Sequence, residues 1–251
     1  MDLVSIITPL YNAEAWIEET AESIFRQTHT NWEWIIINDC SKDDSYSIVE
    51  KLAAKDSRIK ILNNETNLKT ARTRNRGIQA ASGKYLAFID SDDIWHPEKL
   101  EKQISFMKAT GAKLSFHAYR KFRKSLENQG QTILVPDKVN YKDLLKSNVI
   151  ACLSAMYDAE ALGKVEMPDG YKAREDYLCW LRILKRIDYA YGMNECLGFY
   201  RILNTSYSAN KLEVAKFQWK LYREVEKLNL FSASINFVFY SLHGLIKNKI
   251  S

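Results

Sequence analysis

"LAFIDSDDIWHPE" (residues 86–98) joins a run of apolar residues to three carboxylates, and this pattern indicates the architecture of the protein. Its first part has the composition of a strand that is buried on both faces. The strand is expected to end at Asp90, and Pro97, a favoured first-turn residue, predicts that a helix begins there. Repulsion among Asp90, Asp92 and Asp93 costs free energy unless something positive lies beside them. We therefore expect a strand, an acidic loop that meets a positive group, and a helix.

The same order of strand and helix occurs three times before this stretch. Strands are predicted at residues 3–10, 32–39, 59–62 and 84–90, and helices at 14–27, 43–56, 70–81 and 97–110. Right-handed crossovers place such consecutive strands in one layer. The sequence therefore predicts an α/β fold with a mostly parallel central sheet and helices on both faces.

Beyond residue 113 the alternation loosens, and no linker rich in Pro or Gly separates the two parts. Mixed strands are expected at 113–122 and 150–158, and helices at 175–187 and 211–228. We interpret residues 1–210 as one domain with a first half (1–112) and a second half (113–210). Residues 211–251 are expected to form a C-terminal helical segment.

Polar side chains follow three of the expected strands. They include Tyr11 after the first strand, Asp39 after the second, and Asp90 and Asp92 after the fourth. A parallel sheet binds ligands beyond the carboxyl ends of its strands, so a ligand is expected at this edge. An Asp-x-Asp pair offers the oxygen ligands that Mg²⁺ or Mn²⁺ prefers, although a turn or a helix cap is the alternative role for these aspartates.

The composition is that of an ordinary globular protein, with 46% hydrophobic and 27% charged residues among 251. A net charge of +5 is mild for a general polyanion binder, so no nucleic-acid partner is expected. The four cysteines contain no CxxC pair, which suits a reducing compartment, and the N-terminus lacks the pattern of a signal peptide. A cytoplasmic location is therefore expected.

Residues 230–246 contain no Asp, Glu, Lys or Arg, yet they include three Ser, an Asn and a His. The segment is short and polar for a helix that spans a bilayer, which needs about 20 predominantly apolar residues. Two interpretations remain open: a helix packed in the core or at an interface, and a helix on the membrane surface beside Lys247 and Lys249. The second would place the protein at the inner face of the plasma membrane.

Several blocks of the chain, in order, resemble those of the family 2 glycosyltransferases, which have the GT-A fold. The blocks are "VSIITPLYN", "IIINDCSKDDS", "NLKTARTRNRGIQAASGKYLAFIDSDDIWHP", "REDYLCWLRI" and "YRILNTSYS", and they span residues 3–208. The resemblance implies a Rossmann-like GT-A fold. Its first half would bind a nucleotide-sugar donor, and its second half would meet the acceptor.

The resemblance also implies roles for individual residues. Asp90 and Asp92 match the family's DxD motif, with Asp92 the first choice as a ligand of Mn²⁺ or Mg²⁺, whereas Asp93 is expected to be a cap or supporting group. In the Glu175-Asp176 pair, Asp176 matches the catalytic base, since a positioned carboxylate can take the proton of an attacking hydroxyl. Two acids at a helix start also favour the helix dipole, which is the alternative. The residues expected at the nucleotide are Pro9, Tyr11, Asp39, Lys69, Arg74 and Asp90.

Supporting residues complete the expected site. Glu175 is expected on the acceptor side, and Arg201 either meets the phosphates or braces the active-site loop. Trp95 is a candidate for the acceptor pocket together with Tyr171 and Trp180, because sugar rings present apolar faces that pack on aromatics. Core packing is the alternative, above all for Trp180 on its amphipathic helix.

The chain departs from the family pattern at a few positions. Lys69 stands where the family often has Gly, and Thr73 where it has Ala. Lys69 either adds a phosphate contact or closes the loop differently. Leu203 stands where many relatives carry a His, so that residue's family role is not carried over, whereas Ser206 matches.

Together these features predict a metal-dependent, inverting glycosyltransferase of the hexosyltransferase type. It would transfer a sugar from a UDP-sugar to a glycan or lipid-linked saccharide in cell-surface polysaccharide biosynthesis. A sugar-1-phosphate nucleotidyltransferase should have a Gly-rich loop after the first strand, where this chain has "TPLYNAEAW". A nucleotide-sugar-binding scaffold without catalysis is the other alternative.

Overall fold

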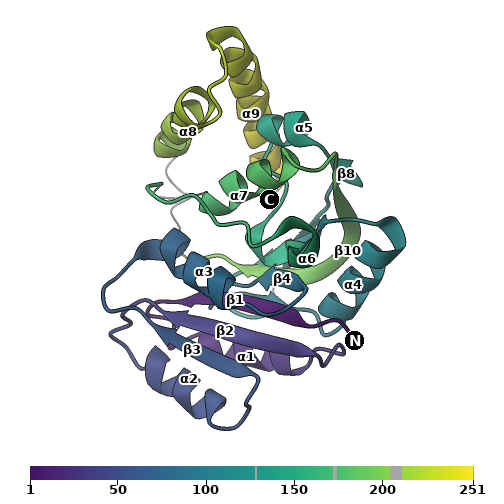
Figure 1. Cartoon of the computed structure of the whole chain (residues 1–251). Coiled ribbons are helices and arrows are strands. Elements are labelled where there is room, and N and C mark those ends of the chain that lie inside the picture. The colour runs from purple at the N-terminus through teal and green to yellow at the C-terminus, as the bar shows by residue number, and fades with distance from the viewer. Residues whose placement is uncertain (128, 172–173, 204–210, 251) are drawn as a thin grey trace.

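The computed structural model describes residues 1–127, 129–171, 174–203 and 211–250. Strands and helices alternate along the first half of the chain, as predicted, and the order is visible in Figure 1. The elements are β1 (Val4–Leu10), α1 (Ile17–Phe25), β2 (Trp32–Asn38), α2 (Ser45–Ala53), β3 (Ile59–Asn63), α3 (Lys69–Ala80), β4 (Tyr85–Phe88), β5 (Ile94–Trp95) and α4 (Lys99–Thr110).

The second half is more irregular. Its elements are β6 (Leu114–Phe122), β7 (Gln129–Ile133), β8 (Lys138–Val139), α5 (Tyr141–Lys146), the 3₁₀ turn η1 (Cys152–Ser154), β9 (Met156–Asp158), α6 (Ala159–Leu162), α7 (Glu175–Leu184) and β10 (Ala190–Arg201). The described C-terminal elements are α8 (Lys211–Lys220), a π-helical turn (Leu221–Val225) and α9 (Leu230–Ile250).

One sheet runs through both halves in the order β3-β2-β1-β4-β9-β6-β10-β5. The first four strands in this order are parallel, whereas β9 is antiparallel to both β4 and β6, and β10 is parallel to β6. The prediction of an α/β fold with a mostly parallel sheet is confirmed for the first half, and the second half is mixed. The division at residues 112 and 210 stays a prediction.

The prediction of a strand over residues 150–158 is wrong for most of that range. Only Met156–Asp158 is a strand, and it follows the 3₁₀ turn. Side chains take the backbone acceptors that a sheet would need: Trp95 donates to the Leu153 carbonyl at 2.8 Å, and Gln103 donates to the Ser154 carbonyl at 2.9 Å. Because these partners are distant in the sequence, the local pattern of residues 150–158 contains no sign of them.

The sheet is buried on both faces. Side chains alternate along each strand, so that Ile7 and Ile35 face one core and Ile6 and Ile36 face the other. The first core is closed by α3, α5 and α7, and the second by α1, α2 and α4, as Figure 1 shows. Helices on both faces, as predicted, leave the carboxyl ends of the parallel strands as an open edge.

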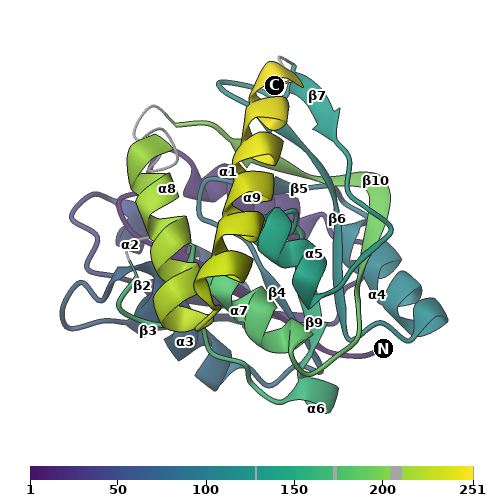
Figure 2. The same cartoon turned by 90° about the horizontal axis from the view of Figure 1, so that it is seen from above.

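The C-terminal helices lie outside the sheet, against α5 and α7 (Figures 1 and 2). Tyr222 and Ala233 are buried there, and the Tyr177 hydroxyl on α7 accepts a hydrogen bond from Gln218 on α8. Within the described part of the chain, no helix has the length and hydropathy that crossing a bilayer requires.

Candidate functional site

The register of the sheet brings the predicted residues to one edge. β1 and β2 pair from Val4 opposite Trp32 to Leu10 opposite Asn38, so both strands end together. A cavity of about 340 Å³ opens just beyond them. It is lined by Pro9, Tyr11, Asn12, Ala13, Trp16, Asp39, Asn67, Lys69, Thr70, Thr73, Arg74, Asp90, Ser91, Asp92 and Leu203. All of the residues expected at the nucleotide are in this set.

Asp39 is held by the chain that leads into α3. Its carboxylate accepts hydrogen bonds from the Asn64 amide at 2.6 Å and from the backbone N–H groups of Leu68 at 2.7 Å and Lys69 at 3.0 Å. Only 4% of Asp39 is exposed. The acid therefore fixes the loop that delivers Lys69 to the cavity, and Asn64 is a partner that sequence reasoning missed.

Tyr11 lies at the rim of the cavity and is 50% exposed. The following residue, Asn12, has a φ of +49° and accepts a hydrogen bond from the Lys42 N–H at 2.8 Å. This contact ties the loop after β1 to the loop after β2. An exposed aromatic ring on a fixed loop is suited to stacking against a planar base.

Arg74 joins the two carboxylate groups of the site. It is 4% exposed and forms ion pairs with Asp90 and with Glu175, the latter at 2.7 Å. A buried guanidinium requires such partners, because an unpaired buried charge is costly. The contact brings α3, the end of β4 and the start of α7 together, although Asp90 and Glu175 are far apart in sequence.

The acidic loop is held from behind. The Thr20 hydroxyl donates to the carbonyls of Ser91 at 3.1 Å and Asp93 at 2.8 Å. Arg201 donates from Nε to the Asp92 carbonyl at 2.8 Å, and its backbone N–H donates to the Asp93 carboxylate at 2.9 Å. These bonds use the backbone of the loop and the Asp93 side chain, and they leave Asp90 and Asp92 to line the cavity.

Arg201 is 1% exposed and does not line the cavity. Its guanidinium lies between the rings of Trp16 at 4.4 Å and Phe122 at 4.3 Å, and it forms an ion pair with Glu19. Of the two roles expected for Arg201, the geometry matches the brace of the loop.

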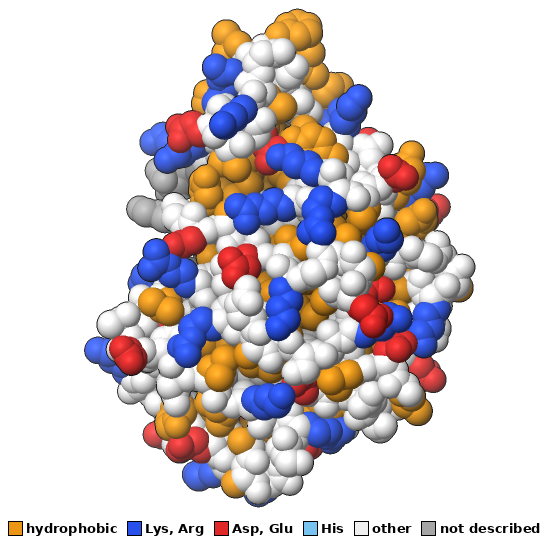
Figure 3. Space-filling model, in the orientation of Figure 1, with side chains coloured by type: hydrophobic (Ala, Val, Ile, Leu, Met, Phe, Trp, Pro, Cys, Tyr) orange, Lys and Arg blue, Asp and Glu red, His pale blue; other side chains and the backbone are white. Residues whose placement is uncertain are grey.

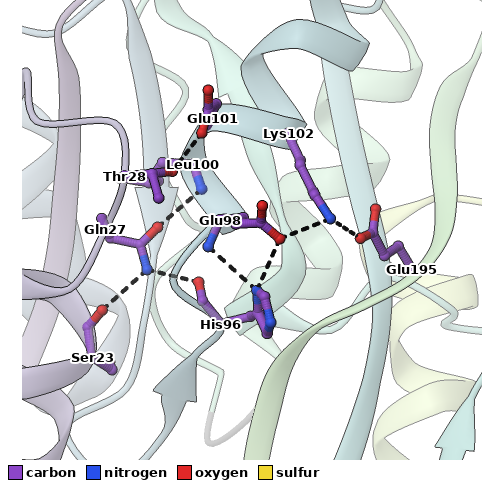
Figure 4. A network of polar contacts seen from close by, with 9 residues as sticks. All are labelled: Ser23, Gln27, Thr28, His96, Glu98, Leu100, Glu101, Lys102 and Glu195. Atoms are coloured by element: carbon purple, nitrogen blue, oxygen red, sulfur yellow. Dashed lines mark hydrogen bonds and ion pairs between the residues drawn. The ribbon is translucent and has the colours of Figure 1, made fainter.

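A second set of contacts fixes the chain that follows the acidic loop (Figure 4). Gln27 accepts from the Leu100 N–H at 3.0 Å and donates to the His96 carbonyl at 2.8 Å. Lys102 pairs with Glu98 at 3.0 Å and with Glu195 on β10. The end of α1 and the strand β10 therefore both anchor the start of α4.

Burial raises the pKa values of two aspartates in the acidic loop. Burial, and next the charge of Asp90, raise the pKa of Asp92 to about 6. Burial, followed by the charges of Asp92 and Asp90, raises the pKa of Asp93 well above its usual range. An excess of negative charge at one place favours binding of a cation.

The site fits a divalent cation held together with a diphosphate. The described residues contain no group of three or more His, Cys, Asp or Glu placed to hold a metal ion by themselves. Mg²⁺ commonly takes one or two protein carboxylates and completes its shell with phosphate oxygens and water. Asp92 and Asp90 supply two such carboxylates at the cavity wall. Leu203, which also lines the cavity, supplies no metal ligand.

Asp176 is partly exposed in the first turn of α7, next to Glu175. Burial, and next the charge of Glu175, raise its pKa to about 6, against the effect of Arg74. Cys152 also interacts with these groups, and burial raises the pKa of its thiol well above the usual range, which keeps it protonated.

Two of the three aromatic residues expected at the acceptor are buried. Trp95 is 2% exposed and Trp180 fully buried, both within the two cores. Tyr171 is partly buried, with its ring edge-on to Phe217 at 5.8 Å. Core packing, the alternative stated for Trp180, therefore describes Trp95 as well. Ser206 lies outside the described residues.

Comparisons with known proteins agree with this arrangement. The family model "Glycosyl transferase family 2" matches residues 5–164. TuaG of Bacillus subtilis, a glycosyltransferase named for teichuronic acid biosynthesis, is 41% identical over 245 residues, which are 98% of this chain and 97% of TuaG. WfgD of Escherichia coli, named as a UDP-Glc:α-D-GlcNAc-diphosphoundecaprenol β-1,3-glucosyltransferase, is 39% identical over 224 residues, 86% of this chain and 84% of WfgD.

A solved structure of S. aureus TarS in complex with UDP-GlcNAc superposes with a TM-score of 0.73. The match covers 96% of this chain and 71% of that one at 19% identity, and it supports the fold. Because the family model matches more than half of the chain and TuaG is similar over nearly all of it, the chain belongs to glycosyltransferase family 2.

Proposed function

We propose that this glycosyltransferase transfers a sugar from a UDP-sugar to a lipid-linked saccharide, with inversion at the anomeric carbon. The observation that carries the proposal is the Arg74 bridge. Arg74 pairs with Asp90 at the cavity and with Glu175, which adjoins Asp176. One buried cation thus ties the donor-side acids to the acid expected on the acceptor side.

Each wall of the cavity suits one part of the donor. The Tyr11 ring would stack on the base, and Asp39, which lines the cavity, would meet the base and ribose side of the nucleotide. Lys69 and Arg74 would offset charge on the diphosphate. Asp92, with Asp90, would hold Mn²⁺ or Mg²⁺, which when bound would neutralise negative charge on the leaving diphosphate.

Asp176 would act as the general base. As the acceptor oxygen bonds to the anomeric carbon, the bond from that carbon to the diphosphate breaks, and the proton of the acceptor hydroxyl passes to Asp176. A carboxylate with a pKa of about 6 is largely ionised at pH 7 and more basic than an ordinary aspartate. Attack opposite the leaving group turns a UDP-α-sugar into a β-linked product.

The relatives support the choice of pathway. Their names place TuaG in teichuronic acid biosynthesis and give WfgD a diphosphoundecaprenol acceptor and a UDP-glucose donor. We infer that this chain acts in cell-surface polysaccharide biosynthesis, on a lipid-linked acceptor at the cytoplasmic face of the membrane.

Calorimetry with UDP tests the donor site. UDP should bind with Mn²⁺ present and bind weakly without it, Asp92→Asn should remove the effect of Mn²⁺, and Asp176→Asn should leave UDP binding unchanged. Turnover of UDP-glucose on a GlcNAc-diphospho-polyprenol acceptor should fall 10²–10⁴-fold in Asp176→Asn. Absence of UDP binding under all conditions would refute the proposal. Binding without turnover over many acceptors would favour the non-catalytic scaffold, and an α-linked product would exclude inversion.

A further inference from the structure

Helix α9 carries a row of apolar side chains that are exposed in the described part of the protein. Phe231, Ile235, Val238 and Leu242 are 77%, 40%, 56% and 51% exposed. Their spacings of four, three and four residues place them on one side of a helix. We call these four residues the α9 stripe.

The opposite side of α9 is fixed to the protein. Ala233 is fully buried, and the Phe237 ring packs edge-on against Trp219 at 5.6 Å. The Tyr240 hydroxyl accepts a hydrogen bond from Arg174. Since each residue of a helix advances by about 100°, Tyr240 points away from Val238 and Leu242. The stripe is therefore the outward side of a docked helix.

Isolated exposed apolar side chains are common, but this set is contiguous on one helix. No charged residue interrupts residues 230–246. Figure 3 shows hydrophobic side chains at the tip of the molecule over the C-terminal helices, with Lys and Arg side chains and fewer acidic ones on its flanks. A continuous apolar face rimmed by basic residues is the pattern of a helix that lies in a membrane interface.

The charge around the stripe distinguishes an anionic bilayer from a second copy of the chain. Residues 211–251 contain seven Lys and Arg against three Glu, a net charge of +4 out of +5 for the chain. Arg223 and Lys227 precede the stripe and are exposed, Lys146 lies 5.7 Å from the Phe239 ring, and Lys247 and Lys249 follow in the sequence. A two-fold dimer through the stripe would bring these like charges together, whereas anionic head groups would neutralise them.

We propose that the α9 stripe docks the protein on an anionic lipid bilayer. Docking on the bilayer does not depend on the proposed function. Only the consequence of docking for the acceptor rests on the proposed function. Arg174, held by Tyr240 on the inner side of α9, directly precedes Glu175 and Asp176. A docked α9 would therefore place the start of α7 about one helix diameter, ~10 Å, from the bilayer, within reach of an acceptor anchored there.

Arg174 is itself in a strained conformation. Its φ of +64° is uncommon for a residue with a side chain, and its guanidinium is held by Tyr240 and by Gln218 at 3.3 Å. The C-terminal helices thus hold the side chain of Arg174 at the entry to α7. This contact gives α9 a direct link to the acceptor side of the site.

Co-sedimentation of the full chain with vesicles tests the docking face. Binding is expected to phosphatidylcholine vesicles that contain phosphatidylglycerol, with weaker binding to phosphatidylcholine alone and at high salt. The double variant Phe231→Gln, Ile235→Gln, chosen to keep helix propensity, should lower partitioning about tenfold or more. Leu134→Gln is the matched control, because Leu134 is 67% exposed outside α9, and it should bind like the wild type.

UDP calorimetry on the same variants separates this proposal from the proposed function. The α9 variant should bind UDP as the wild type does. Equal vesicle binding by the wild type and the α9 variant, or no vesicle binding at all, would overturn the docking proposal and leave the donor site standing. A concentration-dependent dimer that the α9 variant abolishes would show that the stripe meets a second copy of the chain.

Discussion

Lys69 has a φ of +66°, which is the left-handed region that favours glycine. The family often has Gly at this position, and the structure gives the reason, because the backbone here turns to present two N–H groups to Asp39. We predict that Lys69→Gly is more stable than Lys69→Ala by about 1 kcal/mol, since only alanine retains the strain. Urea unfolding of the two variants measures the difference.

Both substitutions remove the same amine, so their effects on UDP affinity should be equal if the Lys69 amine meets the diphosphate. Equal stability of the glycine and alanine variants would show that the backbone at this position carries no strain.

Residue types in the sequence indicated which side chains carry charge to the cavity. They did not indicate which of the expected site residues are buried in the interior. Asp39, Asp90 and Asp92 reach the cavity because they follow strands of known direction. Arg201 and Trp95 lie in the interior because of partners far away in the sequence, such as Glu19 and Leu153. A single sequence contains no signal for pairs of that separation.

The acidic loop depends on an element that is remote in sequence, the helix α1. Thr20 supplies one hydroxyl to two carbonyls of the loop. We predict that Thr20→Val lowers the free energy of unfolding by about 1–3 kcal/mol, because it removes the donor and leaves buried carbonyls unpaired. Thr20→Ser keeps the hydroxyl and serves as the control.

Urea unfolding should rank Thr20→Val below Thr20→Ser, and calorimetry should show a weaker effect of Mn²⁺ on UDP binding in Thr20→Val. A valine variant as stable as the serine variant would mean that the loop keeps its shape without α1.

Elements with strong local patterns were predictable. The apolar runs of β1 and β2 and the helices that follow them have periods that need no tertiary context. The turn before β9 was not predictable, because Trp95 and Gln103 take its backbone acceptors. The mixed direction of β9 and β10 likewise depends on pairing between distant strands.

For the whole molecule, the right-handed crossover rule predicted that the first four strands share one layer, but it did not predict their order β3-β2-β1-β4. The buried acids have a global consequence that the fold makes testable. The pKa values of Asp92 and Asp176 are raised to about 6, and burial raises that of Asp93 well above its usual range. In the unfolded chain these carboxyls would titrate near pH 4.

Between about pH 4 and pH 6 these three acids therefore hold more protons in the folded protein than in the unfolded chain, whereas buried His117, whose pKa is lowered to about 3, acts in the opposite sense. The free energy of unfolding should fall as the pH rises through this window, the reverse of the usual behaviour of ion-paired acids. Urea unfolding at a series of pH values measures the slope.

Asp92→Asn combined with Asp176→Asn should flatten the slope. Asp169→Asn is the control, because it removes an exposed acid whose pKa Arg72 lowers, and it should leave the slope unchanged. Mn²⁺ with UDP should also flatten the slope in the wild type, because a ligand that binds ionised Asp92 favours loss of its proton. A slope shared by the wild type and the double variant would mean that these acids are solvated in the folded protein.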